Sequence, residues 1–187
     1  MKIKIPKKKN KKFIENFFIK KGLKYLVDLS KKKGEKKRLK LLNLKSSSKP
    51  TPPELDDLYN LYQYVVLNKR TTICEFGSGW SSLIFNLALR DLKKKYFKDV
   101  KNLRNDNPFE LFIVDDVRKY LNVSKKRIEK FNKQLSIKNP IKVNYIRADV
   151  EMTYFNDRMC NEFKKLPLCN PDFIYLDGPN QFKIKKK

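Results

Sequence analysis

The sequence has no histidine among its 187 residues. That absence excludes catalytic triads that use a histidine base, and it excludes zinc or haem sites that use histidine ligands. Cysteine is sparse as well, and the three that are present have neither an even number nor C-x-x-C spacing: Cys74, Cys160 and Cys169. We therefore expect no disulfide framework and no metal site, and we predict a reducing, cytoplasmic location. Any catalysis must use carboxylates, Lys, Tyr, Cys or a bound cofactor.

Long apolar runs and arginine are also scarce. No apolar run approaches the ~20 residues needed to cross a bilayer, and only 8 of the 45 basic residues are arginine. Arginine is the residue that binds phosphate and guanine in bidentate fashion, so an excess of lysine is weak evidence for a nucleic-acid partner. Despite the net charge of +25, we do not expect nucleic acid to be the partner.

The positive charge is concentrated at the N-terminus, where residues 1–50 hold 19 Lys+Arg and 3 Asp+Glu. Residues 1–12 are mostly lysine and predict a solvated tail, whereas 13–26 place apolar residues at near-helical spacing. Such a basic amphipathic helix either packs on its own domain or lies on anionic lipid, which makes residues 1–30 a candidate for peripheral membrane contact. We predict a lysine-rich, partly helical extension and linker over 1–50, followed by a domain over 51–187.

Strands and helices alternate through this second region. A helix start at 51–54 offers Thr51 as cap and a proline at the first helical position. Four β-prone runs follow, at 71–76, 111–114, 141–147 and 172–176, with helical patterns from Ser81, over 117–134 and, more weakly, over 151–166. Because the strands are apolar throughout and alternate with helices, the pattern predicts an α/β fold in which helices cover both faces of a parallel sheet.

Polar residues follow all four predicted strands. They are Glu75, Gly77, Ser78 and Gly79 after the first strand, Asp115 and Asp116 after the second, Asp149 after the third and Asp177 after the fourth. The carboxyl ends of parallel strands meet at one edge of a sheet, where helix N-termini also point and ligands bind. An acid after the second strand suits ribose hydroxyls, one after the third suits an adenine amino group, and the fourth has room for catalysis. Each of them also fits an ordinary turn or helix cap.

In order and type these motifs resemble the class I S-adenosylmethionine-dependent methyltransferases. The resemblance rests on Glu75-Phe76-Gly77-Ser78-Gly79-Trp80-Ser81, on the two later acids and on Phe173-Ile174-Tyr175-Leu176-Asp177-Gly178-Pro179. It implies S-adenosylmethionine as cofactor, with Gly77 and Gly79 beside its methionine part, Asp115 or Asp116 at the ribose and Asp149 near the adenine. Asp177 would then face the transferable methyl group and an acceptor that the sequence does not identify.

The sequence departs from that family in three ways. The third glycine of the first motif is Ser81, and 36 positions separate Gly79 from Asp115, which implies an insertion over about 98–108. The family's Rossmann-like sheet has seven strands, whereas this chain supplies four, in the order 3-2-1-4. We therefore expect a truncated form that holds cofactor weakly, positions no acceptor and self-associates through the bare edge strand 172–176.

Two other functions remain open. An NAD(P)- or nucleotide-binding Rossmann domain would have a G-x-G-x-x-G loop, but the residue three positions after Gly79 is Ser82. A non-catalytic binding module would instead use residues 1–50 to dock on an anionic surface, and its binding would depend steeply on salt.

Overall fold

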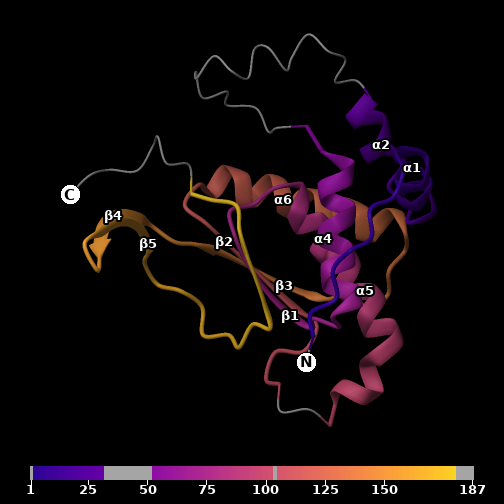
Figure 1. Cartoon of the computed structure of the whole chain (residues 1–187). Coiled ribbons are helices and arrows are strands. Elements are labelled where there is room, and N and C mark those ends of the chain that lie inside the picture. The colour runs from indigo at the N-terminus through magenta and orange to yellow at the C-terminus, as the bar shows by residue number, and fades with distance from the viewer. Residues whose placement is uncertain (1, 32–51, 103–104, 180–187) are drawn as a thin grey trace.

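The computed structural model describes residues 2–31, 52–102 and 105–179 (Figure 1). The N-terminal part holds helices α1 (Lys11–Lys20) and α2 (Lys24–Lys31). The elements that follow are α4 (Leu55–Leu67), β1 (Thr72–Phe76), α5 (Trp80–Val100), β2 (Glu110–Asp115), α6 (Arg118–Gln134), β3 (Lys142–Arg147), β4 (Val150–Phe155), β5 (Arg158–Phe163) and β6 (Phe173–Leu176).

Four of these strands form a parallel sheet with the order β3-β2-β1-β6. β1 lies in the middle and pairs with both neighbours, so that Ile73 is opposite Leu111 on β2 and Phe173 on β6. The α/β class and the parallel pairing are confirmed. The strand predicted over 172–176 takes the predicted place beside β1, but it is the sixth strand of the chain because a hairpin comes before it.

That hairpin replaces a predicted helix. The helix expected over 151–166 is wrong, because β4 and β5 pair antiparallel across this segment. Asn156 and Asp157 connect the strands with φ angles of +48° and +60°. Two consecutive residues with positive φ are the signature of a type I′ turn, the connection that matches the twist of a two-stranded ribbon.

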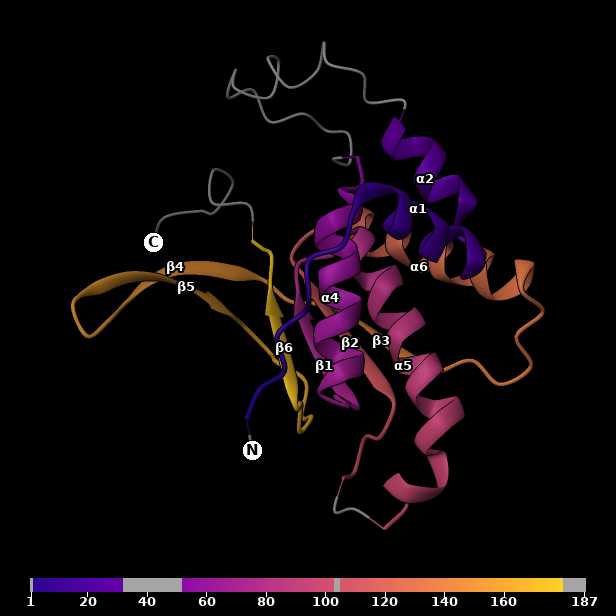
Figure 2. The same cartoon turned by 45° about the vertical axis from the view of Figure 1, so that its right-hand side comes forward.

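The two faces of the sheet are covered differently, and this corrects the expectation of helices on both. α4, α5 and α6 lie on one side of the sheet in Figure 2, and the β4–β5 hairpin lies on the other. On the hairpin side Phe163 of β5 packs against Phe76 at the end of β1, with ring centroids 5.0 Å apart. The connection from β3 to β6 has to cross this face, because right-handed crossovers that run in opposite directions along a sheet use opposite faces.

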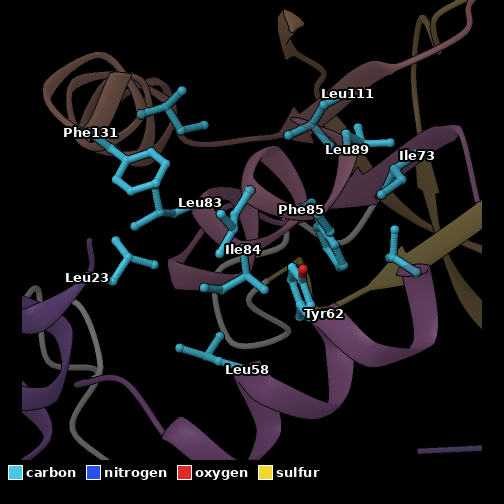
Figure 3. Close-up of a cluster of buried hydrophobic side chains, with 14 of the residues drawn as sticks. Leu23, Leu58, Tyr62, Ile73, Leu83, Ile84, Phe85, Leu89, Leu111 and Phe131 are labelled. Atoms are coloured by element: carbon cyan, nitrogen blue, oxygen red, sulfur yellow. The ribbon is translucent and has the colours of Figure 1, made fainter. Parts of the chain in front are cut away.

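The main core lies between the helices and the sheet (Figure 3). α5 is central to it: its side chains at Leu83, Ile84, Phe85 and Leu89 are fully buried. Phe85 meets β6 through the rings of Phe173 and Tyr175, whose centroids lie 5.8 and 5.3 Å away. Helix α5 therefore fixes the position of both the central strand and the edge strand.

The N-terminal helices belong to the same core. α1 and α2 bury Ile14, Phe18, Leu26 and Val27, and the chain bends between them at Gly22, whose φ is +81°. The single apolar stretch predicted over 13–26 is thus two helices. Residues 32–51, which include most of the predicted linker, lie outside the described residues.

A partly buried acid connects α1 to the rest of the helical layer. Asp91 on α5 accepts hydrogen bonds from Lys21 and from the Tyr62 hydroxyl of α4, the latter at 2.8 Å. Burial alone would raise the pKa of the Asp91 carboxyl, but the hydrogen bonds from Lys21 and Tyr62 outweigh it and the pKa is lowered. The charge on Asp91 therefore contributes to docking α1.

Two helix boundaries differ from the sequence prediction. α4 begins at Leu55, and its N-cap residue Glu54 makes no side-chain cap hydrogen bond; the predicted cap Thr51 lies outside the described residues. α5 continues to Val100, so the insertion expected over 98–108 is partly an extension of this helix. The long separation between the glycine loop and Asp115 is therefore mostly helix.

Asp172 fastens the start of β6 to the start of β1. Its carboxylate accepts the backbone N–H groups of Thr71 and Thr72 at 2.8 to 3.0 Å. We expect Asp172→Ala to lower the free energy of unfolding by about 2 kcal/mol, because two backbone donors lose their acceptor. Urea denaturation measures the change. Asp172→Asn keeps one acceptor oxygen and should lose less; equal losses for both variants would contradict this account.

Candidate functional site

The loop after β1 turns sharply and packs against the loop after β6. Gly77 has a φ of +93°, a conformation that side chains rarely adopt, and its N–H donates to the Val114 carbonyl at 2.8 Å. A Cβ placed on Gly77 would lie 3.0 Å from the backbone of Asp177 and of Gly178. The glycine therefore allows the carboxyl ends of β1 and β6 to meet, and it explains why the sequence has glycine here.

Glu75 lies beneath this loop with its side chain completely buried. Its carboxyl oxygens accept hydrogen bonds from the hydroxyls of Ser81 and, at 2.6 Å, Ser82, both in the first turn of α5. Burial raises the pKa of the Glu75 carboxyl to about 8; the two serine bonds oppose that rise, and the carboxyls of Asp177 and Asp115 add to it. Ser81, which replaces the third glycine of the methyltransferase motif, thus binds Glu75, the acid at the start of that motif.

Asp115 ends β2 and lies next to the same loop. One carboxylate oxygen accepts the Ser78 hydroxyl, and the other accepts the Val117 N–H at 2.8 Å. Burial raises the pKa of Asp115, with the Ser78 and Val117 hydrogen bonds acting in the opposite direction. A carboxylate has about four lone-pair positions, so Asp115 keeps acceptor capacity for a ligand hydroxyl. The neighbouring Asp116 is half-buried.

Asp177 completes the group at the rim of the sheet. Its N–H donates to the Phe76 carbonyl at 2.8 Å, which continues the β1–β6 ladder by one residue. The residue is exposed, yet the protein atoms around its carboxyl displace enough water to raise its pKa. Asp177 is therefore reachable from solvent beside a turn that is otherwise packed.

Helix α6 supports the glycine loop from the helical side of the sheet. Ser124 donates to the Gly79 carbonyl at 3.4 Å, and the Arg127 guanidinium lies over the ring of Trp80 at 3.7 Å from its centroid. Burial lowers the pKa of Arg127. Ser124 and Arg127 are not predictable from the sequence pattern, because only the fold brings α6 to the loop.

Asp149 lies outside this group. It follows β3 at the same edge of the sheet, but it is exposed and its carboxylate pairs with Arg147. The structure therefore brings together Glu75, Gly77, Ser78, Asp115 and Asp177, as the sequence predicts, and holds Asp149 one strand further away. Gly79 is also at the loop, and an added Cβ there would meet only the Ser81 hydroxyl, at 3.6 Å.

The cysteines and acids form no metal centre within the described residues: no group of three His, Cys, Asp or Glu there could hold an ion. Cys74 and Cys169 both belong to the small cluster on the hairpin side of the sheet. Burial raises the pKa of the Cys74 thiol to about 12, so this cysteine is not prepared to act as a nucleophile.

Comparisons with protein-family models, with curated proteins and with solved structures find no match to this chain. Among the helices in the described ranges, none is both long and apolar enough to cross a bilayer.

Proposed function

We propose that the chain is an S-adenosylmethionine-binding protein of methyltransferase type, with a Rossmann-like site at the carboxyl ends of β1, β2 and β6. The observation that carries the proposal is the cluster of three acids, Glu75, Asp115 and Asp177, around a glycine turn. In an open parallel sheet, ligands bind at the point where the strand order reverses, and that point is next to β1.

The charge of this cluster favours a cationic ligand over a phosphorylated one. The whole chain has a net charge of +25, yet the ionisable side chains beside the glycine turn are acids, Asp115 and Asp177. A pyrophosphate would be repelled by Asp115 and Asp177, whereas a sulfonium would be attracted, and a ribose would find acceptors. S-adenosylmethionine therefore suits the site better than NAD(P) or ATP.

The residues present fit the cofactor in type and position. Asp115 would accept hydrogen bonds from the ribose hydroxyls in place of the one from Ser78. The methionine part of the cofactor would lie along the turn at Gly77 and Gly79, where no side chains block it. When bound, the cofactor supplies an activated methyl group for an O, N or C nucleophile. Asp177 would lie at the exposed side and orient the acceptor or hold its proton. Asp149 would reach the adenine only after leaving Arg147.

Calorimetric titration of S-adenosylmethionine tests this proposal. We expect binding to the natural chain and at least about tenfold weaker binding to Asp115→Ala, because charge-assisted hydrogen bonds to the ribose are lost. Asp28→Ala is the matched control, because it removes the same kind of carboxylate from an exposed position on α2, and it should weaken binding by less than about threefold.

The titration also separates the alternatives. Tighter binding of NAD⁺ or ATP than of S-adenosylmethionine would support a nucleotide-binding domain instead. If neither Asp115→Ala nor the conservative Asp115→Asn changes the affinity while both stay folded, the assigned site is wrong. If none of the three ligands binds, the proposed function fails.

A further inference from the structure

The first residues of the chain follow a fixed path along α4, although their lysine content predicts a solvated tail. We call residues 2–9 the strap. The backbone of Lys4 forms two hydrogen bonds with the Asn68 side chain just after α4: its N–H donates at 2.8 Å and its carbonyl accepts at 2.9 Å. The strap then enters α1, whose N-cap Asn10 accepts the Phe13 N–H. Figures 1 and 2 both show this segment running beside α4.

Between the strap and α4 lies a groove of about 600 Å³ with an apolar floor. Ile3 and Ile5 line it from the strap, and Tyr59 and Leu67 line it from α4. Ile3 is 63% exposed and Ile5 is 73% exposed, so the groove is open to solvent along the strap. The exposed ring of Phe13 on α1 extends this apolar surface, because it meets the groove residue Tyr59 edge-on with the ring centroids 6.0 Å apart.

Lysines surround this apolar groove. Four of its lining residues are Lys2, Lys4, Lys7 and Lys9. Residues 2–31 contain two acids: Glu15 pairs with Lys31 at 2.9 Å, and Asp28 is exposed on α2. Because Lys4 is anchored through its backbone, its ammonium group is not used to hold the strap. The rim therefore carries a strong positive charge beside exposed isoleucines.

We propose that this groove and its lysine rim dock on the surface of an anionic lipid bilayer. The lysines would pair with lipid phosphates, and Ile3, Ile5 and Phe13 would enter the boundary between headgroups and acyl chains. An ordered strap loses little conformational entropy when it binds, which favours docking over a floppy tail of the same composition.

Charge alone would attract any polyanion, and the isoleucines are what favour lipid. Exposed aliphatic side chains between lysines gain free energy only where hydrocarbon is available, as at a membrane interface. Nucleic acid is instead recognised by arginine forks and by aromatic stacking. The groove lining contains no arginine, its tyrosine, Tyr59, is buried, and the Lys9 ammonium lies over the Phe13 ring at 5.2 Å from its centroid. Lipid is thus the partner that uses both features of the groove.

The experiment is sedimentation of the full chain with phosphatidylcholine vesicles that contain or lack phosphatidylglycerol. We expect binding only to the anionic vesicles, with an affinity that falls as salt rises. Ile3→Ser combined with Ile5→Ser should weaken binding by at least about tenfold without changing the charge. Its matched control is Leu166→Ser with Leu168→Ser in the segment between β5 and β6, two residues that are 52% and 101% exposed, and this variant should bind normally.

A second pair of variants tests the lysines. Replacing the four groove lysines by glutamine should weaken binding by at least about tenfold, whereas four exposed lysines of α6 should be replaceable with little effect: Lys119, Lys126, Lys130 and Lys133. Equal losses in the two lysine sets, or unchanged binding in the isoleucine variant, would overturn the proposal. If a DNA duplex displaces the chain from the vesicles, and the isoleucine variant binds as tightly as the natural chain, the surface binds nucleic acid instead. Unchanged thermal unfolding midpoints show that each variant is folded.

Discussion

Gly77→Ala lowers the free energy of unfolding by about 3 kcal/mol in our expectation, a large effect for one methyl group. Two costs add. The φ of +93° is strained for any residue with a side chain, and the new Cβ would lie 3.0 Å from backbone atoms of Asp177 and Gly178, which cannot rotate away as a side chain would. The β1 and β6 loops must therefore separate, which also disturbs Asp177.

The chain supplies its own control for this prediction. Gly79, two residues later, has a φ of −160°, and its added Cβ would meet only the Ser81 hydroxyl at an ordinary contact distance of 3.6 Å. Gly79→Ala should change the free energy of unfolding by less than about 1 kcal/mol in the same urea titration. If the two alanine variants are equally stable, the close contact between the β1 and β6 loops is not formed in solution.

The contrast between these glycines shows how far the sequence can predict the site. Both follow an apolar strand and precede a helix, so the sequence places both at the loop. Two features that only the fold shows make Gly77 irreplaceable: its φ of +93° and its contact with the partner loop, about 100 residues later. The acids Asp115 and Asp177 could be assigned to one edge of the sheet because parallel strands all end there. Their contacts with Ser78 and Phe76 depend on the tertiary structure.

The connection from β3 to β6 shows a different limit. Its segment contains Thr153, Tyr154 and Phe155, which favour a strand, and the Asn156-Asp157 pair that favours a two-residue turn. The weak helical pattern over 151–166 is a poorer guide to this segment than its local turn residues. Tyr154 and Phe155 are more than 70% exposed, so no buried face gave a periodic signal.

The strap was missed for a related reason. Its course depends on two hydrogen bonds from Asn68, which is 64 residues away in the sequence, and lysines give no hydrophobic periodicity to read. By contrast, the helix predicted over 117–134 agrees closely with α6, because its buried residues repeat at helical spacing: Leu121, Ser124, Ile128 and Phe131. Local pattern predicts an element well when its burial is one-sided.

Glu75→Gln is the second substitution for which we expect a large effect. It should change how the free energy of unfolding depends on pH. The pKa of this buried carboxyl is about 8 in the folded chain, compared with an ordinary value of 4.5. A raised folded pKa means that the neutral acid contributes its full stability below about pH 4. As pH rises toward 8 the unfolded chain ionises first, so the free energy of unfolding falls by about 3 to 5 kcal/mol.

Glutamine cannot ionise, and its amide can still form hydrogen bonds with both Ser81 and Ser82. We therefore expect the variant to match the natural chain near pH 4 within about 1 kcal/mol and to be several kcal/mol more stable near pH 8. Urea titrations across this range measure the difference, with Glu129→Gln on the exposed side of α6 as the control that removes the same charge away from the core. If the free energy of unfolding of the Glu75 variant and of the natural chain changes with pH in the same way, the prediction is wrong. The two serines and the start of α5 would then hold Glu75 as a carboxylate. In that case the negative charge at the site, and with it the preference for a sulfonium ligand, would be greater still.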